Sequence, residues 1–217
     1  MKKRGEKMDV NVKKIMELKI ERTIKNLEAR QFEVFVVDDG KGAVEKVKKM
    51  IPSGASVNLG GSQTLFELGL VDDLSTMDIE FQNRYAENAD VQAVFRAAYS
   101  ADVYITSTNA LTEDGILYNV DGNGNRVSAM IYGPKEVIVI AGINKLVKDM
   151  KAAVARVNEI AGPMNNVRLN KETPCTMLGT CADCISSDRI CAAHVAISRS
   201  QTPKRIKIIL VKESLGY

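Results

Sequence analysis

The feature of this sequence that most restricts its fold is an alternation of short apolar runs with longer amphipathic stretches. The apolar runs carry Val, Ile and Phe, as β-strands do, and lie at residues 32–39, 56–62, 102–111, 134–144 and 205–211. The stretches between them repeat apolar residues at helical spacing, at residues 12–30, 42–50, 63–70, 88–99 and 146–160. Strands that alternate with helices on this scale predict a parallel sheet covered by helices.

The expected fold is therefore an α/β domain with a mainly parallel sheet, flanking helices and a β-hairpin extension. The hairpin is predicted where DGNGN (121–125) separates two strand-like runs, because Asp-Gly and Asn-Gly pairs favour tight turns. We expect a flexible N-terminus over residues 1–10 and a single domain over residues 11–217, which is long enough for one full core. A cysteine-rich segment at 170–200 is expected to be irregular and anchored at both ends.

Composition argues against two classes of function. Aromatic residues make up 5% of the chain, Trp is absent and the net charge is only +3, so no nucleic-acid-binding surface is expected. No apolar run approaches the roughly 20 residues that cross a bilayer, so no membrane span is expected. The opening MKKRGEKMDV lacks the apolar centre of a signal peptide. We therefore expect a cytoplasmic protein in a reducing compartment.

All four cysteines lie in the last fifth of the chain, at Cys175, Cys181, Cys184 and Cys191. The central pair has the CxxC spacing that recurs at zinc and iron–sulfur sites, because two thiolates so placed bind one metal centre without strain. The four thiols are therefore candidate ligands for an iron–sulfur cluster or for zinc. Free thiols and disulfides are the alternatives. His194, the only histidine, would share a helix face with Cys191 if this segment were helical.

Polar residues follow two predicted strands, at the edge where an open α/β sheet binds its ligands. Gly60, Gly61, Ser62 and Thr64 lie between a strand and a helix. Glycines there let the backbone approach an anion closely, and free N–H groups favour negative charge. A tight turn in which Ser62 caps the helix is the alternative interpretation.

The second polar cluster follows the apolar part of the strand at 102–111 and contains Ser107, Asn109, Glu113 and Asp114. Its acidic residues are candidates for catalysis, and the whole cluster is a candidate pocket lining or a solvated turn. Arg84, in a predicted surface loop, is a further candidate cation for an anionic substrate. P-loop, G-x-G-x-x-G and G-x-S-x-G patterns do not occur, so neither nucleotide binding nor a serine hydrolase is expected.

Three segments carry a resemblance to a known family. They are the strand–GGSQT–helix unit, the run TSTNALTEDGILYNVDGNGNRVSAMIYGPKEVIVIAGINKLV, and RIKIILVKESLGY after the cysteine segment. Together they resemble the LUD-domain family, the lactate-utilisation proteins of the LutC/YkgG type, formerly domain of unknown function 162. The stretch TPCTMLGTCADCISSDRICAAH resembles the cysteine-bearing subgroup of that family. The resemblance implies the fold of the ribose-5-phosphate isomerase, glucosamine-6-phosphate deaminase and CoA-transferase superfamily.

The resemblance leads to three hypotheses about function. In the first, the chain takes part in organic-acid oxidation, of lactate to pyruvate, with iron–sulfur or flavin partner subunits, and binds a small anionic metabolite. In the second, it is a stand-alone isomerase or CoA-transferase-like enzyme that acts on a phosphorylated or acyl substrate, with Glu113 as base or nucleophile. In the third, it is a non-catalytic assembly subunit whose cysteines hold structural zinc. A homo-oligomer is compatible with all three.

Overall fold

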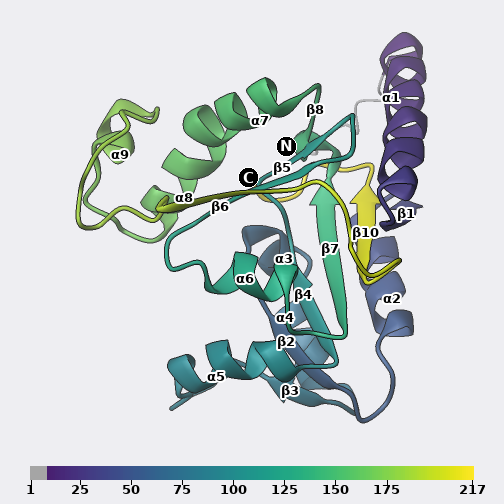
Figure 1. Ribbon diagram of the computed structural model, residues 1–217, viewed down its shortest axis with the longest axis vertical. Helices are drawn as coiled ribbons and strands as arrows, with labels where there is room; N and C mark the ends of the chain where they lie inside the picture. Colours follow the sequence, from purple (N-terminus) through teal and green to yellow (C-terminus); the bar gives the residue numbers. More distant parts are fainter. Residues whose placement is uncertain (1–8) are drawn as a thin grey trace, which may run out of the picture.

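A six-stranded parallel sheet forms the centre of the fold. The computed structural model describes residues 9–217, and Figure 1 shows their arrangement. The strand order is β1-β10-β7-β4-β2-β3, and every neighbouring pair is parallel. The strands are β1 (Glu33–Val37), β2 (Ser56–Leu59), β3 (Glu80–Gln82), β4 (Val103–Thr106), β7 (Glu136–Gly142) and β10 (Ile206–Val211). The predicted α/β fold with a mainly parallel sheet is therefore confirmed.

Helices cover both faces of this sheet because its central strands are apolar on both sides. In β7, Ile138 and Ile140 pack in one cluster with α2 (Gly40–Met50), α3 (Gln63–Glu67) and α4 (Leu70–Ser75). Val137 and Val139 belong to a second cluster, with α1 (Val10–Ala29) and α6 (Asn125–Ile131). A continuous run of branched residues thus marks a strand buried on both faces. The short α5 (Val91–Ala97) has no buried residue of its own.

The N-terminal helix starts slightly earlier than its apolar spacing predicts. The Asp9 side chain caps α1 by accepting hydrogen bonds from the backbone amides of Asn11 at 2.9 Å and Val12 at 3.3 Å. Val10 is therefore helical. The rest of the predicted flexible N-terminus, residues 1–8, lies outside the residues that the structure describes.

A β-hairpin extends the fold, but its turn lies at residues 113–116 rather than at DGNGN. The antiparallel strands β5 (Ala110–Thr112) and β6 (Leu117–Asp121) form it, and β8 (Leu146–Val147) and β9 (Ala193–Ile197) complete a second sheet. The predicted strand after residue 125 is wrong, because these residues form α6. Gly124 precedes α6 with a φ of 75°, and its amide donates to the Asp121 side chain at 3.3 Å. Glycine adopts a positive φ equally well in a hairpin turn and in front of an α-helix, and the Asp121 side chain can accept a backbone hydrogen bond in either place. The sequence pattern therefore did not distinguish a hairpin from a helix start.

The helix predicted at 146–160 begins later and continues further. After β8, α7 covers Met150–Arg156, and one π-helical turn, η3 (Val157–Ala161), leads into α8 (Gly162–Arg168). A π turn widens the helix by one residue. Pro163, which has no amide hydrogen for a helical bond, lies two residues after the end of this turn. The Asn158 carbonyl of this turn accepts a hydrogen bond from the amide of Cys181 at 2.8 Å. The cysteine segment is therefore attached to the π turn.

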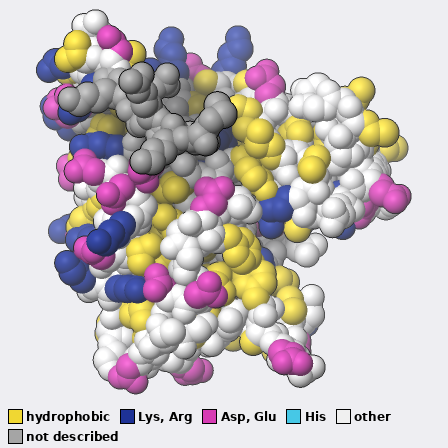
Figure 2. Space-filling view, turned by 180° about the vertical axis from the view of Figure 1, so that it is seen from behind, with side chains coloured by type: hydrophobic (Ala, Val, Ile, Leu, Met, Phe, Trp, Pro, Cys, Tyr) yellow, Lys and Arg dark blue, Asp and Glu magenta, His cyan; other side chains and the backbone are white. Residues whose placement is uncertain are grey.

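The cysteine-rich segment at 170–200, expected to be irregular, follows α8 and contains the short α9 (Pro174–Leu178) and β9. In Figure 1, α8 and α9 project at the left, away from α1 at the right. We refer to α8, α9 and the loop after α9 as the lobe. Its exposed apolar side chains are together called the apolar face, and they are Met164, Val167, Met177, Leu178 and Ile185. Figure 2 shows apolar atoms on the surface of the lobe, at the right of that view. Over residues 9–217, no helix is both long enough and apolar enough to span a membrane.

Candidate functional site

A cavity of about 220 Å³ lies at the carboxyl edge of the parallel sheet. Three adjacent strands end there: Gly61 follows β2, Ser107 follows β4, and Lys145 follows β7 in the 3-10 helix η2 (Ile143–Lys145). The other walls come from the end of β6, from α6, and from η3 and α8. Loops that follow parallel strands converge at this edge, which is where open α/β sheets bind ligands.

Lys145 is the buried cation of this cavity, with 2% of its surface exposed. Its Nζ donates hydrogen bonds to Thr64 Oγ1 at 2.8 Å and to Ser107 Oγ at 2.9 Å. No carboxylate within residues 9–217 forms an ion pair with it. A buried charge without a partner is costly, so a lysine in this position is a candidate for a functional role.

Burial is the main reason that the pKa of Lys145 falls from 10.5 to about 7. Desolvation disfavours the ammonium form. The guanidinium groups of Arg156 and Arg126 act in the same direction, and Glu67 acts in the opposite direction. A lysine with this pKa is partly an uncharged amine near neutral pH. Such an amine accepts protons and attacks carbonyl carbons, which an ammonium group does not.

The two hydroxyl groups that contact Lys145 present lone pairs to it, because their own protons have other acceptors. Thr64 Oγ1 donates to the carbonyl of Leu215 at 3.2 Å, and Ser107 Oγ lies 3.4 Å from the carbonyl of Thr108. Thr64 belongs to α3, whereas Ser107 follows β4. Two separate elements therefore orient the lysine amine.

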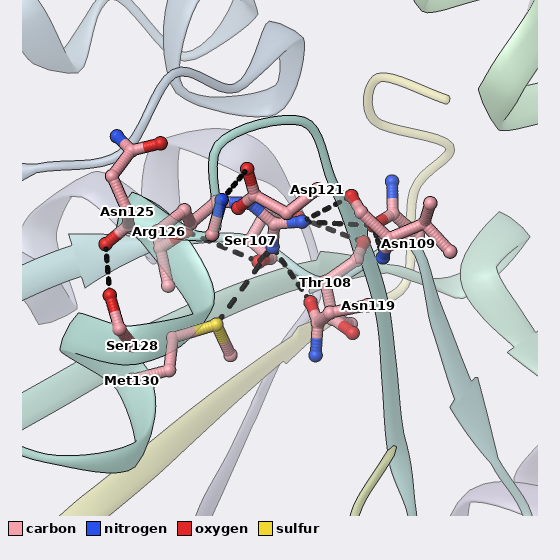
Figure 3. A network of polar contacts seen from close by, with 12 residues as sticks. Ser107, Thr108, Asn109, Asn119, Asp121, Asn125, Arg126, Ser128 and Met130 are labelled. Atoms are coloured by element: carbon pink, nitrogen blue, oxygen red, sulfur yellow. Dashed lines mark hydrogen bonds and ion pairs between the residues drawn. The ribbon is translucent and has the colours of Figure 1, made fainter. Parts of the chain in front are cut away.

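Arg126, in the first turn of α6, holds the cavity wall together (Figure 3). Its Nη1 donates to Asn119 Oδ1 at 2.7 Å and its Nη2 to Asn109 Oδ1 at 3.0 Å. Nη1 also donates to the Ser107 carbonyl at 3.2 Å, and Nε lies 3.4 Å from Asp121 Oδ2. All three guanidinium nitrogens are thus occupied by protein groups. Arg126 therefore organises the site instead of offering free donors to a ligand.

The loop that carries Lys145 is fixed by two neighbouring side chains. Arg156 donates from Nε to the Asn144 carbonyl at 3.0 Å and from Nη1 to the Asn109 carbonyl at 2.6 Å. The Asn144 side chain in turn binds the C-terminal residues, through the Leu215 amide at 3.1 Å and the Gly216 carbonyl at 2.9 Å. These bonds set the position of Lys145 relative to the ends of β4 and β7.

Arg168, on α8, is the cation of the cavity wall that keeps donor capacity. Its Nη2 donates to Asn165 Oδ1 at 2.9 Å, while its buried Nε has no hydrogen-bond partner in the part of the chain described. Asp121 is the one carboxylate side chain among the described residues that line the cavity. Its Oδ2 accepts no hydrogen bond there and lies 3.4 Å from Arg126 Nε. With three cationic side chains and one carboxylate, the wall favours an anionic ligand.

The structure brings the predicted glycine turn together with Ser107 and Asn109. Gly61 and Ser62 line the cavity, and their amides donate to no protein acceptor within residues 9–217. The Ser62 side chain makes no capping hydrogen bond to α3. Gly60 packs so closely that a Cβ atom would lie 2.8 Å from Thr106 Oγ1. A side chain at residue 60 would therefore push into the end of β4.

The structure places Glu113 and Asp114 away from this cavity, in the hairpin turn between β5 and β6. The Glu113 carboxylate forms ion pairs with Arg22 and with Lys19, the latter at 3.5 Å. Its carbonyl accepts from the Asn26 side chain at 2.8 Å. The turn thus anchors α1 to the second sheet. The catalytic role predicted for these two residues stays a prediction, and their position does not support it.

The four cysteines do not surround a common point. Cys175 is buried, Cys181 is exposed, and Cys184 and Cys191 are half-buried. The Arg189 side chain donates to the backbone carbonyls of Cys184 at 2.5 Å and Cys191 at 2.9 Å. Within residues 9–217, no three His, Cys, Asp or Glu side chains are grouped so that they could hold a metal ion. In this arrangement the cysteines do not fit a cluster or a zinc ion, so neither enters the chemistry below.

The structure also places the two remaining candidates from the sequence, His194 and Arg84. His194 lies in β9, so it does not share a helix face with Cys191, and its Nδ1 is 2.8 Å from the hydroxyl of Tyr118. Arg84 lies against Gly61, where its guanidinium occupies the space that a Cβ atom would need. Arg84 is therefore close to the glycine turn, although it is not among the residues that line the cavity.

Sequence reasoning missed the three cationic side chains of the cavity, Arg126, Lys145 and Arg168. The run at 134–144 gave one available signal, because Lys145 follows it directly at the carboxyl end of a buried strand. The sequence pattern predicted a strand that ends at residue 144 and a helix that begins at residue 146, and it indicated no role for the lysine between them. Arg126 and Arg168 lie in helices whose placement at the cavity depends on the tertiary fold.

Comparisons with known proteins agree with this fold. The family model of the LUD domain matches residues 20–211. No curated protein matches the sequence. A DUF162 family protein from Deinococcus radiodurans has a similar structure, with a TM-score of 0.53 and 13% identity over 90% of this chain and 98% of that chain. The structure of eIF2B beta from Chaetomium thermophilum reaches a TM-score of only 0.39, with 14% identity over 52% of this chain and 44% of that chain, and carries no weight for the fold.

Proposed function

Because the chain belongs to the LUD-domain family, we propose that its cavity binds a small organic-acid anion in an oxidation of the lactate-to-pyruvate type. One observation carries this proposal: the buried Lys145, which has no carboxylate partner among the described residues and lies in a wall with more positive than negative side chains. An anionic ligand would supply the negative charge that pairs with Lys145, which no protein carboxylate within residues 9–217 supplies. The cost of burying the lysine would then be partly offset when the acid binds.

The size of the cavity also favours a small acid. Sites for drug-sized ligands measure roughly 300–1,000 Å³, whereas this cavity measures about 220 Å³. An acid of three or four carbons is the kind of molecule that such a space encloses. A whole acyl-CoA would have to extend beyond it.

In this proposal the chain binds and orients the acid, and the electrons leave through another subunit. Oxidation of a 2-hydroxy acid to a 2-oxo acid releases two electrons and two protons, so an electron acceptor is required. We assign that acceptor to an iron–sulfur or flavin partner subunit. The apolar face supports such a contact, because α8 contributes Met164 and Val167 to this face and Arg168 to the cavity.

Isothermal titration calorimetry with L-lactate and pyruvate tests the proposal. Removal of a charged hydrogen-bonding partner costs about 1.5–3 kcal/mol, so Lys145→Met should weaken binding by roughly 10- to 100-fold. Lys148→Met removes an exposed lysine three residues away and should bind like the parent. The proposal is wrong if neither acid binds the parent, or if Lys145→Met binds both acids as tightly as the parent does.

Ribose 5-phosphate and acetyl-CoA serve as comparison ligands in the same titrations. They represent the phosphorylated and acyl substrates of an isomerase or CoA-transferase. If either binds more tightly than both small acids, the cavity serves that second class of enzyme and the organic-acid assignment fails.

A further inference from the structure

We propose that the side-chain amine of Lys145 forms a covalent imine with the carbonyl carbon of a bound 2-oxo acid. This inference rests on the proposed function, because it requires that the cavity accept such an acid. It goes beyond anion binding, since it gives Lys145 a nucleophilic role instead of a purely electrostatic one. Three observations support it: the hydrogen bonds of the amine, its burial near two arginines, and the lack of a carboxylate partner within residues 9–217.

The hydrogen bonds of Lys145 suit an uncharged amine. A neutral amine has two N–H groups and one lone pair, and Lys145 has two acceptors, Thr64 Oγ1 at 2.8 Å and Ser107 Oγ at 2.9 Å. Both hydroxyl protons lie near carbonyl oxygens, as described above, so both oxygens are free to accept from Nζ. With its two N–H groups held in this way, the amine has its lone pair left for a bound molecule. An ammonium group in the same place would have a third N–H without an acceptor in the described chain.

The surroundings of the amine keep it from being fully protonated. Burial acts most strongly, followed by the positive charges of Arg156, behind the loop that carries Lys145, and of Arg126 on α6. Glu67, on α3, favours the ammonium form but forms no ion pair with it. The pKa of about 7 that results leaves a substantial fraction of amine at neutral pH. Desolvation and neighbouring cations are the means by which proteins activate lysine as a nucleophile.

The carboxylate of a 2-oxo acid has a separate place in the same cavity. Both terminal nitrogens of Arg126 are saturated by protein acceptors, whereas those of Arg168 make one hydrogen bond within residues 9–217, from Nη2 to Asn165 Oδ1. The carboxylate would therefore contact the terminal nitrogens of Arg168. The unused amides of Gly61 and Ser62 add neutral donors. A carboxylate bound by these groups would leave the adjacent carbonyl carbon facing the amine. Arg168 and Lys145 would thus recognise the two functional groups that define a 2-oxo acid.

The reaction is balanced without an oxidant or a reductant. The lone pair of Nζ attacks the carbonyl carbon, so that a C–N bond forms and the π bond of the carbonyl breaks. Nitrogen then loses one proton and the oxygen gains one, which gives a carbinolamine. The oxygen gains a second proton and leaves as water when the C–O bond breaks, and nitrogen loses its remaining proton to give the imine. Asp121, the carboxylate of the cavity wall, or solvent exchanges these protons.

Reductive trapping tests the imine. The purified chain is incubated with pyruvate and sodium cyanoborohydride, its intact mass is followed, and peptide mapping locates any adduct. We expect one reduced pyruvate per chain, on Lys145, and no adduct with L-lactate, which has no carbonyl carbon to attack. The yield should fall as the pH is lowered from about 8 to about 6, because protonation removes the lone pair. Lys148→Met should be trapped like the parent, and Lys145→Met should not be trapped.

Peptide mapping locates the adduct on the parent chain. The expected adduct on Lys145 therefore does not depend on whether Lys145→Met folds correctly. Calorimetry under the same conditions separates this inference from the proposed function. If pyruvate binds but no adduct forms on Lys145, the imine is wrong and the binding site stands. If neither acid binds, both proposals are wrong. Adducts that spread over exposed lysines and leave Lys145 unmodified also overturn the imine.

Discussion

Replacement of Lys145 by methionine should make the protein more stable, although it removes the central cation of the site. The pKa of this lysine falls from 10.5 to about 7 on folding, and each pH unit corresponds to about 1.4 kcal/mol. The charged lysine therefore costs the folded state about 5 kcal/mol. Methionine avoids this cost but gives up two hydrogen bonds, to Thr64 and Ser107, which are worth about 1 kcal/mol each. The net gain in the free energy of unfolding should be about 2–3 kcal/mol near pH 6.

The gain should depend on pH in a defined direction. Between about pH 7 and pH 10.5 the unfolded chain binds more protons at this residue than the folded chain does, so the parent becomes more stable as the pH rises. The advantage of Lys145→Met should therefore be full below pH 7. It should shrink as the pH rises through 10.5, above which the amine is mostly uncharged in both states.

Urea unfolding of the parent, Lys145→Met and Lys148→Met at several pH values provides the measurement. Lys148 is exposed, so its replacement should change stability by less than about 0.5 kcal/mol at every pH. Two results would refute the reasoning: a Lys145→Met protein that is less stable than the parent near pH 6, or a gain that stays constant as the pH rises. A stabilised variant that no longer binds the acid would show that this lysine is kept for function.

Four further predictions concern other parts of the molecule. Arg126→Met leaves Asn119 Oδ1 without its donor and Asp121 without its ion-pair partner, so it should lower the free energy of unfolding by about 3–5 kcal/mol in urea titrations. Gly60→Ala should lower the free energy of unfolding by about 1–3 kcal/mol, because the added Cβ overpacks the end of β4. Gly42→Ala in α2 is the control: its Cβ would meet only ordinary contacts, so it should be neutral or stabilising in thermal melts. Glu113→Gln should lower stability by about 1 kcal/mol yet leave pyruvate affinity unchanged, and a loss of affinity in calorimetry would restore its catalytic assignment. If the cysteines bind a cluster, anaerobic reconstitution with iron and sulfide should load less iron on Cys184→Ser than on the parent, and equal loading, or none on the parent, would end that hypothesis.

The central strands of the parallel sheet were predictable because buried strands consist of short runs of apolar, mostly branched residues. Branched residues follow one another without a polar break from Val137 to Ile140 in β7, and Ile208 to Val211 in β10 form a similar apolar run after Lys207. A strand covered on both faces tolerates such a run. The position of the hairpin was not predictable in the same way. Asp121 and Gly124 suit both a tight turn and a helix start, and the packing of Ala129 and Met130 in the core favours the helix.

The candidate site was partly predictable for a related reason. Gly61, Ser62, Ser107 and Asn109 follow strand ends, and the carboxyl ends of neighbouring parallel strands lie at one edge. Glu113 follows the same predicted strand, but the chain continues through β5 before reaching it, and the hairpin carries it to α1. A short distance along the sequence from a strand end therefore predicted a place in the cavity only for the first few residues after the strand.

The sequence by itself determined the central strands of the parallel sheet and the kinds of polar residue that follow them, because local spacing and composition specify these. Only the tertiary structure decided which of those residues form a site. Lys145, Thr64 and Ser107 come from three parts of the chain, and they meet because β2, β4 and β7 are neighbours in the sheet. The charge state of Lys145 depends on burial and on Arg156 and Arg126, which no spacing along the chain reveals. Desolvation and the distances between charges are properties of the packed molecule.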